Sequence, residues 1–240
     1  PPKRLRIEAI YNEEPDRQPP IGYNEYDGYY ADIRWDPVDS PPIAYNSYVN
    51  LYLREATKPY KLARPDVLKE SGIDPSRTWT RLRNLNSGTI YTVYARAYYT
   101  YDAGNTTGIS PESDISNQVK FMTDIEVEAY PYGINQIKIV WDDVWDYNKR
   151  IGYRLYVSEH KDFSGTQPVY ITSEQIGENR PVKVNEAEGK LEYIYTVRDP
   201  GRVYYVKIVP DVQDTQVKKS EEGKIVATAS YIFVKTTKVH

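Results

Sequence analysis

The chain has 240 residues, a formal net charge of −3 and no cysteine, and 27% of its residues are charged. The absence of cysteine excludes disulfides, thiolate metal sites and cysteine nucleophiles. A near-neutral surface of mixed sign argues against a nucleic-acid partner, because nucleic-acid binders present a basic face. No apolar run reaches 18 residues, so we expect no membrane span.

Tyrosine stands out in the composition, with 25 residues beside 17 prolines and 13 glycines. A tyrosine ring can fill a core while its hydroxyl reaches the edge. Aromatic residues favour strands, whereas glycine and proline punctuate turns. The composition therefore predicts an all-β chain.

The first half of the chain opens with a strand and then the polar, proline-rich stretch 12–28, which we interpret as a long loop. The next strand, ADIRW, ends at Trp35. A later stretch breaks the all-β pattern. Pro65 suits the first position of a helix and Gly72 the position after its end, so we predict one short helix over residues 64–73.

Alternation of apolar and polar residues marks two longer strands, at 48–55 and 85–97, each with one buried face. Between them, residues 58–62 are expected to form an edge strand, because proline near its start has no N–H to give to a ladder. Residues 116–123 are expected to close this half. The apolar positions of the two long strands are Val49, Leu51 and Leu53, then Tyr91, Val93, Ala95 and Ala97.

The same order recurs in the second half. IKIVWDDV, containing Trp141, repeats the apolar-x-Trp-Asp-x-Val pattern of ADIRWDPV. It is followed by an alternating strand at 153–159, a proline-led strand at 167–171, a glycine turn with a long strand at 198–210, and a last strand within 228–236. Two copies with about seven short strands each are typical of β-sandwiches.

The repeat predicts two domains, residues 1–123 and 124–240. No glycine-rich or proline-rich spacer separates them, so we expect a semi-rigid, extended arrangement. The chain begins with Pro-Pro, in what reads as a linker, and residues 1–10 lack the apolar segment of a signal peptide. We therefore expect a piece of a longer protein, monomeric within that chain.

The order of these motifs resembles the fibronectin type III domain, an immunoglobulin-like β-sandwich. The resemblance covers nearly the whole chain, as two tandem copies. It implies that Trp35 and Trp141 pack in the cores and that Tyr91 and Tyr204 form tyrosine corners. It also gives Leu85 the place of the turn leucine. The second copy departs here, because Arg198 occupies the equivalent position, and Val197 is expected to serve instead.

Catalytic and metal-binding patterns are weak. His160 is expected to be a solvated turn residue, and neither it nor His240 has a partner at metal-ligand spacing. Each core tryptophan is followed by an aspartate, which we expect to end the strand and face water. The clustered aspartates could offer oxygen ligands to calcium, but a calcium site needs more ligands than the two or three present at each place. Polar strand-to-strand turns, where aspartate is favoured, are therefore the preferred explanation. We predict no enzyme activity, no cofactor and no metal. The cluster consists of Asp36, Asp39, Asp142, Asp143 and Asp146.

Tyrosines supply the candidate binding face. Several occupy the non-core positions of two strands that the sandwich pattern makes neighbours, and one lies in the following loop. Tyrosine is enriched where surfaces meet partners, although cross-strand packing on a solvated sheet is the alternative. The second copy should show a weaker counterpart, with Tyr156 and Tyr205 interrupted by Lys207. The candidate residues are Tyr48, Tyr52, Tyr94, Tyr98 and Tyr101.

The sequence favours a non-catalytic spacer or interaction module of a larger extracellular or cell-surface protein, such as one of a Gram-positive bacterium. Its partner would be a protein or a cell-surface glycan, as in adhesion. The alternative is an accessory region of a secreted polysaccharide-degrading enzyme, with the tyrosine face touching carbohydrate. Both rest on analogy of fold.

Overall fold

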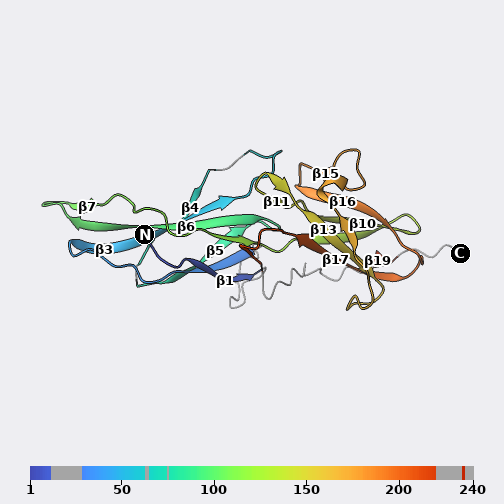
Figure 1. Cartoon of the computed structure of the whole chain (residues 1–240), viewed down its shortest axis with the longest axis horizontal. Coiled ribbons are helices and arrows are strands. Elements are labelled where there is room, and N and C mark those ends of the chain that lie inside the picture. The colour runs from blue at the N-terminus through green and yellow to red at the C-terminus, as the bar shows by residue number, and fades with distance from the viewer. Residues whose placement is uncertain (12–28, 63–64, 75, 220–233, 236–240) are drawn as a thin grey trace, which may run out of the picture.

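The computed structural model describes residues 1–11, 29–62, 65–74, 76–219 and 234–235. Within this part of the chain the protein is an elongated, all-β molecule built from two β-sandwiches (Figure 1), which confirms the predicted fold class. The one helical element among these residues is a 3₁₀ turn, Ser173–Gln175, in the second sandwich.

The first sandwich packs a three-stranded sheet, ordered β1-β2-β5, against a larger sheet ordered β8-β6-β3-β4, with β7 pairing the end of β6. The antiparallel pair β3–β6 is the longest in the molecule and forms the centre of the larger sheet. The strands are β1 (Arg6–Tyr11), β2 (Tyr29–Arg34), β3 (Ala44–Glu55), β4 (Val67–Ile73), β5 (Trp79–Leu85), β6 (Ile90–Asp102), β7 (Thr107–Ile109) and β8 (Val119–Met122).

The second sandwich packs the sheet β15-β16-β10-β9 against the sheet β14-β13-β17-β19. A small hairpin, β11–β12, leaves it beside the junction, and β18 pairs in parallel with β8 of the first sandwich. The strands are β9 (Val127–Tyr132), β10 (Gln136–Asp142), β11 (Trp145–Asp146), β12 (Lys149–Arg150), β13 (Gly152–Ser158), β14 (Val169–Ile171), β15 (Lys183–Asn185), β16 (Lys190–Thr196), β17 (Val203–Asp211), β18 (Val217–Lys218) and β19 (Val234–Lys235).

Each sandwich closes around one buried tryptophan. Trp35 is 1% exposed and Trp141 is 0% exposed. Facing sheets lie about 10 Å apart, a gap that an indole ring spans. Neither indole N–H has a hydrogen-bond partner in the described part of the chain, so apolar packing holds these rings. Trp141 also meets the edge of Tyr153, with ring centroids 5.6 Å apart.

The turn before each long strand is fixed by a tyrosine hydroxyl. The Tyr91 hydroxyl accepts a hydrogen bond from the backbone N–H of Asn86 at 2.9 Å. The Tyr204 hydroxyl donates to the carbonyl of Asp199 at 2.9 Å. Leu85 and Val197 are buried beside these turns, whereas Arg198 is exposed.

Two local predictions in the first half are wrong. Residues 67–73 form β4, not a helix, because they pair with β3 through bulges, and Asn50 accepts the N–H of Gly72. Gly72 adopts a φ of +63°, which suits an irregular strand. Residues 58–62 form a turn rather than an edge strand, and this turn reaches the second sandwich.

Other predictions concern chain ends and loops. QPVYI contains β14 and SNQVKFMT contains β8, as expected. The predicted loop 12–28 lies outside the described residues, as does most of 228–236, of which β19 alone is described. The predicted boundary at Thr123–Asp124 stays a prediction. Buried Ile90 and Met122 of the first half join the core of the second.

Candidate interaction surfaces

Two pairs of stacked tyrosines form the outer face of the larger sheet in the first sandwich. Tyr48 lies directly opposite Tyr98 and Tyr52 opposite Tyr94 in the β3–β6 ladder. In both pairs the ring centroids are 5.2 Å apart. Val49, on the opposite parity, is buried in the core. The sandwich therefore places these four tyrosines on the outer face and stacks them on each other.

Polar side chains hold the hydroxyls of this tyrosine ladder. Tyr94 donates to Asp66 at 2.9 Å, and Arg54 binds the same carboxylate through two N–H groups. Hydrogen bonding from Arg54 lowers the pKa of Asp66. Tyr52 donates to Glu112 at 2.7 Å, and burial together with this bond raises the pKa of Tyr52 to about 12. Tyr94 is only 8% exposed, so much of the ladder is internal packing.

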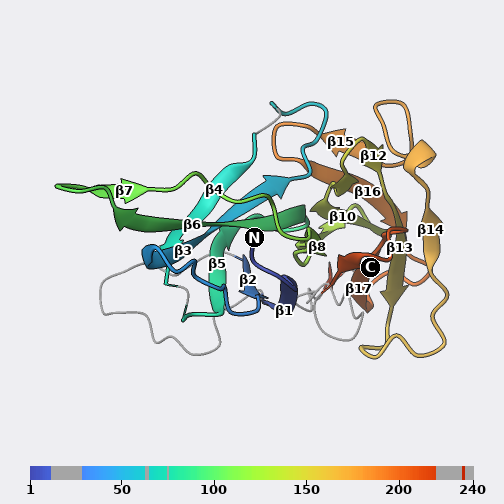
Figure 2. The same cartoon turned by 60° about the vertical axis from the view of Figure 1, so that its left-hand side comes forward.

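Tyr101 has a different place. It pairs with Gly108 of β7, and its ring covers this glycine. A Cβ on Gly108 would come within 2.5 Å of the ring, so only glycine leaves room for it. An aromatic ring over a cross-strand glycine stiffens a sheet edge. Tyr101 thus stabilises the ribbon that β3, β6 and β7 form at the extremity of the molecule (Figures 1 and 2).

A serine repeat closes one edge of this ribbon. In the segment SPESDISN, serines at every third position hydrogen-bond alternate residues of β6. Each serine backbone N–H donates to a β6 carbonyl, and each hydroxyl accepts the N–H of the same β6 residue at 2.9 to 3.0 Å. The pairs are Ser110 with Tyr99, Ser113 with Ala97, and Ser116 with Ala95. The recurrence of serine at every third residue of this segment is the sequence signal that could have predicted this serine strap.

The second sandwich has the weaker aromatic counterpart that the sequence predicts. Tyr156 lies opposite Lys207 rather than opposite a ring. The Lys207 ammonium lies 4.9 Å from the centroid of Tyr156 and 5.1 Å from that of Phe163. A cation over aromatic faces stabilises the surface modestly. No stacked tyrosine pair is found on this sheet within the described residues.

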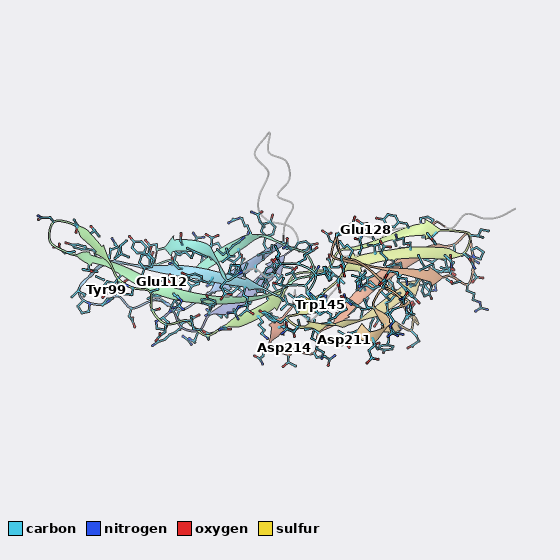
Figure 3. The ribbon with its side chains drawn as sticks, turned by 90° about the horizontal axis from the view of Figure 1, so that it is seen from above. Tyr99, Glu112, Glu128, Trp145, Asp211 and Asp214 are labelled. Atoms are coloured by element: carbon cyan, nitrogen blue, oxygen red, sulfur yellow. The ribbon has the colours of Figure 1, made fainter. Side chains whose placement is uncertain are left out.

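The junction between the sandwiches contains a buried carboxylate that the sequence reasoning missed. The Asp143 side chain is fully buried and accepts two hydrogen bonds from Arg150 and one from the Trp145 indole at 3.0 Å. Tyr60, from the first sandwich, donates to the same carboxylate at 2.8 Å. Burial and the Asp143 charge raise the pKa of Tyr60. Figure 3 shows Trp145 at the junction.

Asp142 is also buried, so the prediction that it faces water is wrong. Its carboxylate accepts the backbone N–H of Glu126 and an N–H of Lys190 at 2.7 Å. Gly88, in a turn of the first sandwich, lies against it: a Cβ there would come within 2.5 Å of the Asp142 Cβ. The Gly88 N–H donates to the Asp124 carbonyl at 2.7 Å. Asp36 differs, because its side chain is partly exposed and pairs with Arg4.

Two further segments cross the junction. On one, Lys120 of β8 pairs with Asp214 at 2.7 Å, just before β18 joins the sheet of the first sandwich (Figure 3). Hydrogen bonding to Lys120 lowers the pKa of Asp214. On the other, the hydroxyl of Tyr147, in the turn of the β11–β12 hairpin, hydrogen-bonds Thr92. The segment around Asp214 and the hairpin of Tyr147 therefore tie the sandwiches together in addition to the turns of Tyr60 and Gly88.

Chemistry-bearing groups are otherwise sparse. His160 is exposed, as predicted, and His240 lies outside the described residues. Among the residues that the structure describes, no group of three histidine or acidic side chains could hold a metal ion. No helix in the described ranges is long and apolar enough to cross a membrane.

Comparison with known proteins adds little to this geometry. No family model matches the chain, and no curated protein matches it. Among solved structures, it is similar to a crystal structure of the FN1–FN3 domains of chicken CNTN1, at 15% identity and a TM-score of 0.33. The match covers 91% of this chain and 63% of the chicken chain.

Proposed function

We propose that the chain is a non-catalytic spacer and interaction module of a larger extracellular or cell-surface protein. Its two sandwiches hold a fixed mutual geometry, and contacts with a partner are made from the ribbon end of the first sandwich. The observation that carries the proposal is the junction, where a buried carboxylate, a close glycine contact and a returning strand all cross between the sandwiches.

A junction of this kind favours a spacer because relative motion would break several contacts together. Opening it would expose the Asp143–Arg150 pair while removing the Tyr60 hydroxyl. Asp143 keeps Arg150 and the Trp145 indole within its own sandwich, so the loss is one hydrogen bond to a charged group, which contributes about 1.5–3 kcal/mol. The apolar side chains of Ile90 and Met122 would lose their packing as well. Domains joined by a flexible linker meet no comparable barrier.

The carboxylates support a structural rather than a chemical role. Asp142 and Asp143 each accept hydrogen bonds from a cation and from backbone or aromatic donors. A general acid or base needs a lone pair or proton within reach of a substrate, and both groups are buried in the junction. This is why we propose no catalysis there.

The stacked tyrosines favour a protein partner over a carbohydrate one. A sugar ring packs on a free aromatic face, whereas Tyr48, Tyr52, Tyr94 and Tyr98 turn their faces to each other. Two strongly exposed apolar side chains lie at the ribbon end, where Ile43 and Ile109 are 68% and 67% exposed. Apolar side chains exposed near one another mark contact surfaces.

Small-angle X-ray scattering on the chain in solution tests the spacer role. We expect the profile to fit one elongated arrangement at every salt concentration, because the buried contacts are screened little. A profile that requires a broad mixture of sandwich orientations would contradict the proposal.

A further inference from the structure

The ribbon of the first sandwich has one edge closed along its whole length. The outer side of β6 is paired by β8 from Ile90 to Val93, by the serine strap from Ala95 to Tyr99, and by β7 from Thr100 to Asp102. Natural sheets close their edges in this way because unpaired backbone groups attract other strands.

The opposite edge of the ribbon is open. β4 pairs with β3 only from Leu53 to Val49, and no described strand pairs with β3 from Ala44 to Tyr48 on that side. Figures 1 and 2 show this end of β3 beside β6 and β7, projecting beyond the smaller sheet. Between Tyr45 and Tyr48, strand β3 thus offers outward-facing N–H and carbonyl groups to this edge, whereas the Ala44 N–H donates to the Pro41 carbonyl.

The open edge lacks charged side chains, which discourage pairing, although its register is irregular between Ala44 and Asn46 and Pro41 and Pro42 precede it. No charged residue occurs between Ser40 and Leu53. Ile43 and Tyr45, at the start of the edge, are 68% and 64% exposed. Charged side chains or prolines within an edge strand normally prevent edge-to-edge contact. The neighbouring β4 carries Lys69 and Glu70, and so it has such protection.

We propose that this edge binds a second copy of the chain, by antiparallel pairing of the two β3 edges around Asn46. The inference deepens the interaction role proposed above by naming the partner. An uncharged segment can lie against itself without like-charge repulsion, and it gives a charged peptide no favourable pairing. Antiparallel pairing of one segment with itself is two-fold symmetric, so it closes as a dimer instead of growing into fibres.

The proposed contact buries little surface, so we expect it to be weak. Pairing over so short a segment of each copy, with Ile43 and Tyr45 covered, stays below the roughly 1,200 Å² that separates weak from standard interfaces. Association is therefore weak for the isolated chain. It strengthens where many copies are held side by side, because tethering raises the effective concentration.

Sedimentation velocity over a concentration series tests the proposal with a matched pair of variants. The wild type is expected to show a reversible dimer, and Tyr45→Lys to weaken it at least tenfold. Tyr170→Lys makes the same change at an equally exposed position of the second sandwich, away from the ribbon, and is expected to leave it unchanged. Circular dichroism checks that both variants remain folded. A wild type that stays monomeric, even if it binds a foreign peptide at this edge, would overturn the proposal, as would equal effects of both variants.

Cross-linking locates the contact, because the chain has no cysteine of its own. Directly opposed residues in an antiparallel pair have Cα atoms about 4.5–5.5 Å apart, within the range of a disulfide. Asn46→Cys is expected to form a dimer on mild oxidation, and Thr107→Cys, on the opposite edge, is not. Equal cross-linking by both would contradict the assigned edge. A failed cross-link would contradict only the proposed dimer. The spacer role is tested by the scattering profile of the monomer, which this result does not change.

Discussion

Replacing Gly88 by alanine is expected to weaken the junction between the sandwiches directly. Gly88 has a φ of +49°, and an added Cβ would lie 2.5 Å from the Asp142 Cβ and 2.7 Å from its carboxylate oxygen. The left-handed conformation costs a residue with a side chain about 1–2 kcal/mol. Overpacking against a buried neighbour adds about 1–3 kcal/mol. The expected loss of unfolding free energy is therefore about 2–5 kcal/mol.

Gly104→Ala is the matched control. Gly104 has a φ of +87°, but a Cβ there would have no heavy atom within 4 Å. It carries the conformational cost without the clash, so the difference between the variants isolates the junction contact at about 1–3 kcal/mol. Urea denaturation at constant slope measures both. Equal losses in the two variants would refute the reasoning, since they would show that Gly88 matters only for its turn.

Three further predictions concern the cores, the serine strap and the ionic contact at the junction. Trp35→Ala should destabilise its sandwich by about 3–5 kcal/mol through the cavity it leaves, and a thermal unfolding transition like the wild type's would contradict the packing described. Ser116→Ala leaves the buried N–H of Ala95 without its partner, costing about 1–3 kcal/mol; hydrogen exchange at that amide should quicken, and unchanged protection would exclude the strap. The lowered pKa of Asp214 means that its pair with Lys120 stabilises the fold above about pH 4 and is lost as pH falls through the folded pKa. The melting-temperature difference between wild type and Asp214→Asn should therefore vanish at low pH, and a difference that persists there would refute the ionic contribution.

The sequence predicts most of the fold because sandwich strands follow alternation that is read locally. Val49, Leu51 and Leu53 are all buried, and the matched tryptophans occupy matched cores. Local reading fails for residues 67–73, where Pro65 and Gly72 imitate helix ends. Pairing with β3 decides the outcome, as tertiary context routinely overrides propensity.

The candidate sites divide in the same way. The alternation of apolar and polar residues places the tyrosines on the outward face of their strands. Their mutual stacking depends on the register of β3 against β6, which no local sequence pattern fixes. The junction was missed because Asp142 and Asp143 look like turn residues in sequence. Their burial comes from Tyr60, Gly88 and other distant segments that fold over them.

The most direct test of a fixed geometry between the sandwiches is a spin-label distance distribution across the junction. Labels at Ser71→Cys and Tyr170→Cys report on the two sandwiches, and a pair at Glu128→Cys and Tyr170→Cys, within the second sandwich, gives the width due to the labels alone. All three positions are exposed. We expect the cross-junction distribution to be as narrow as the control, and to broaden when Gly88→Ala is added. A cross-junction distribution much broader than the control in the otherwise unaltered chain would contradict the account.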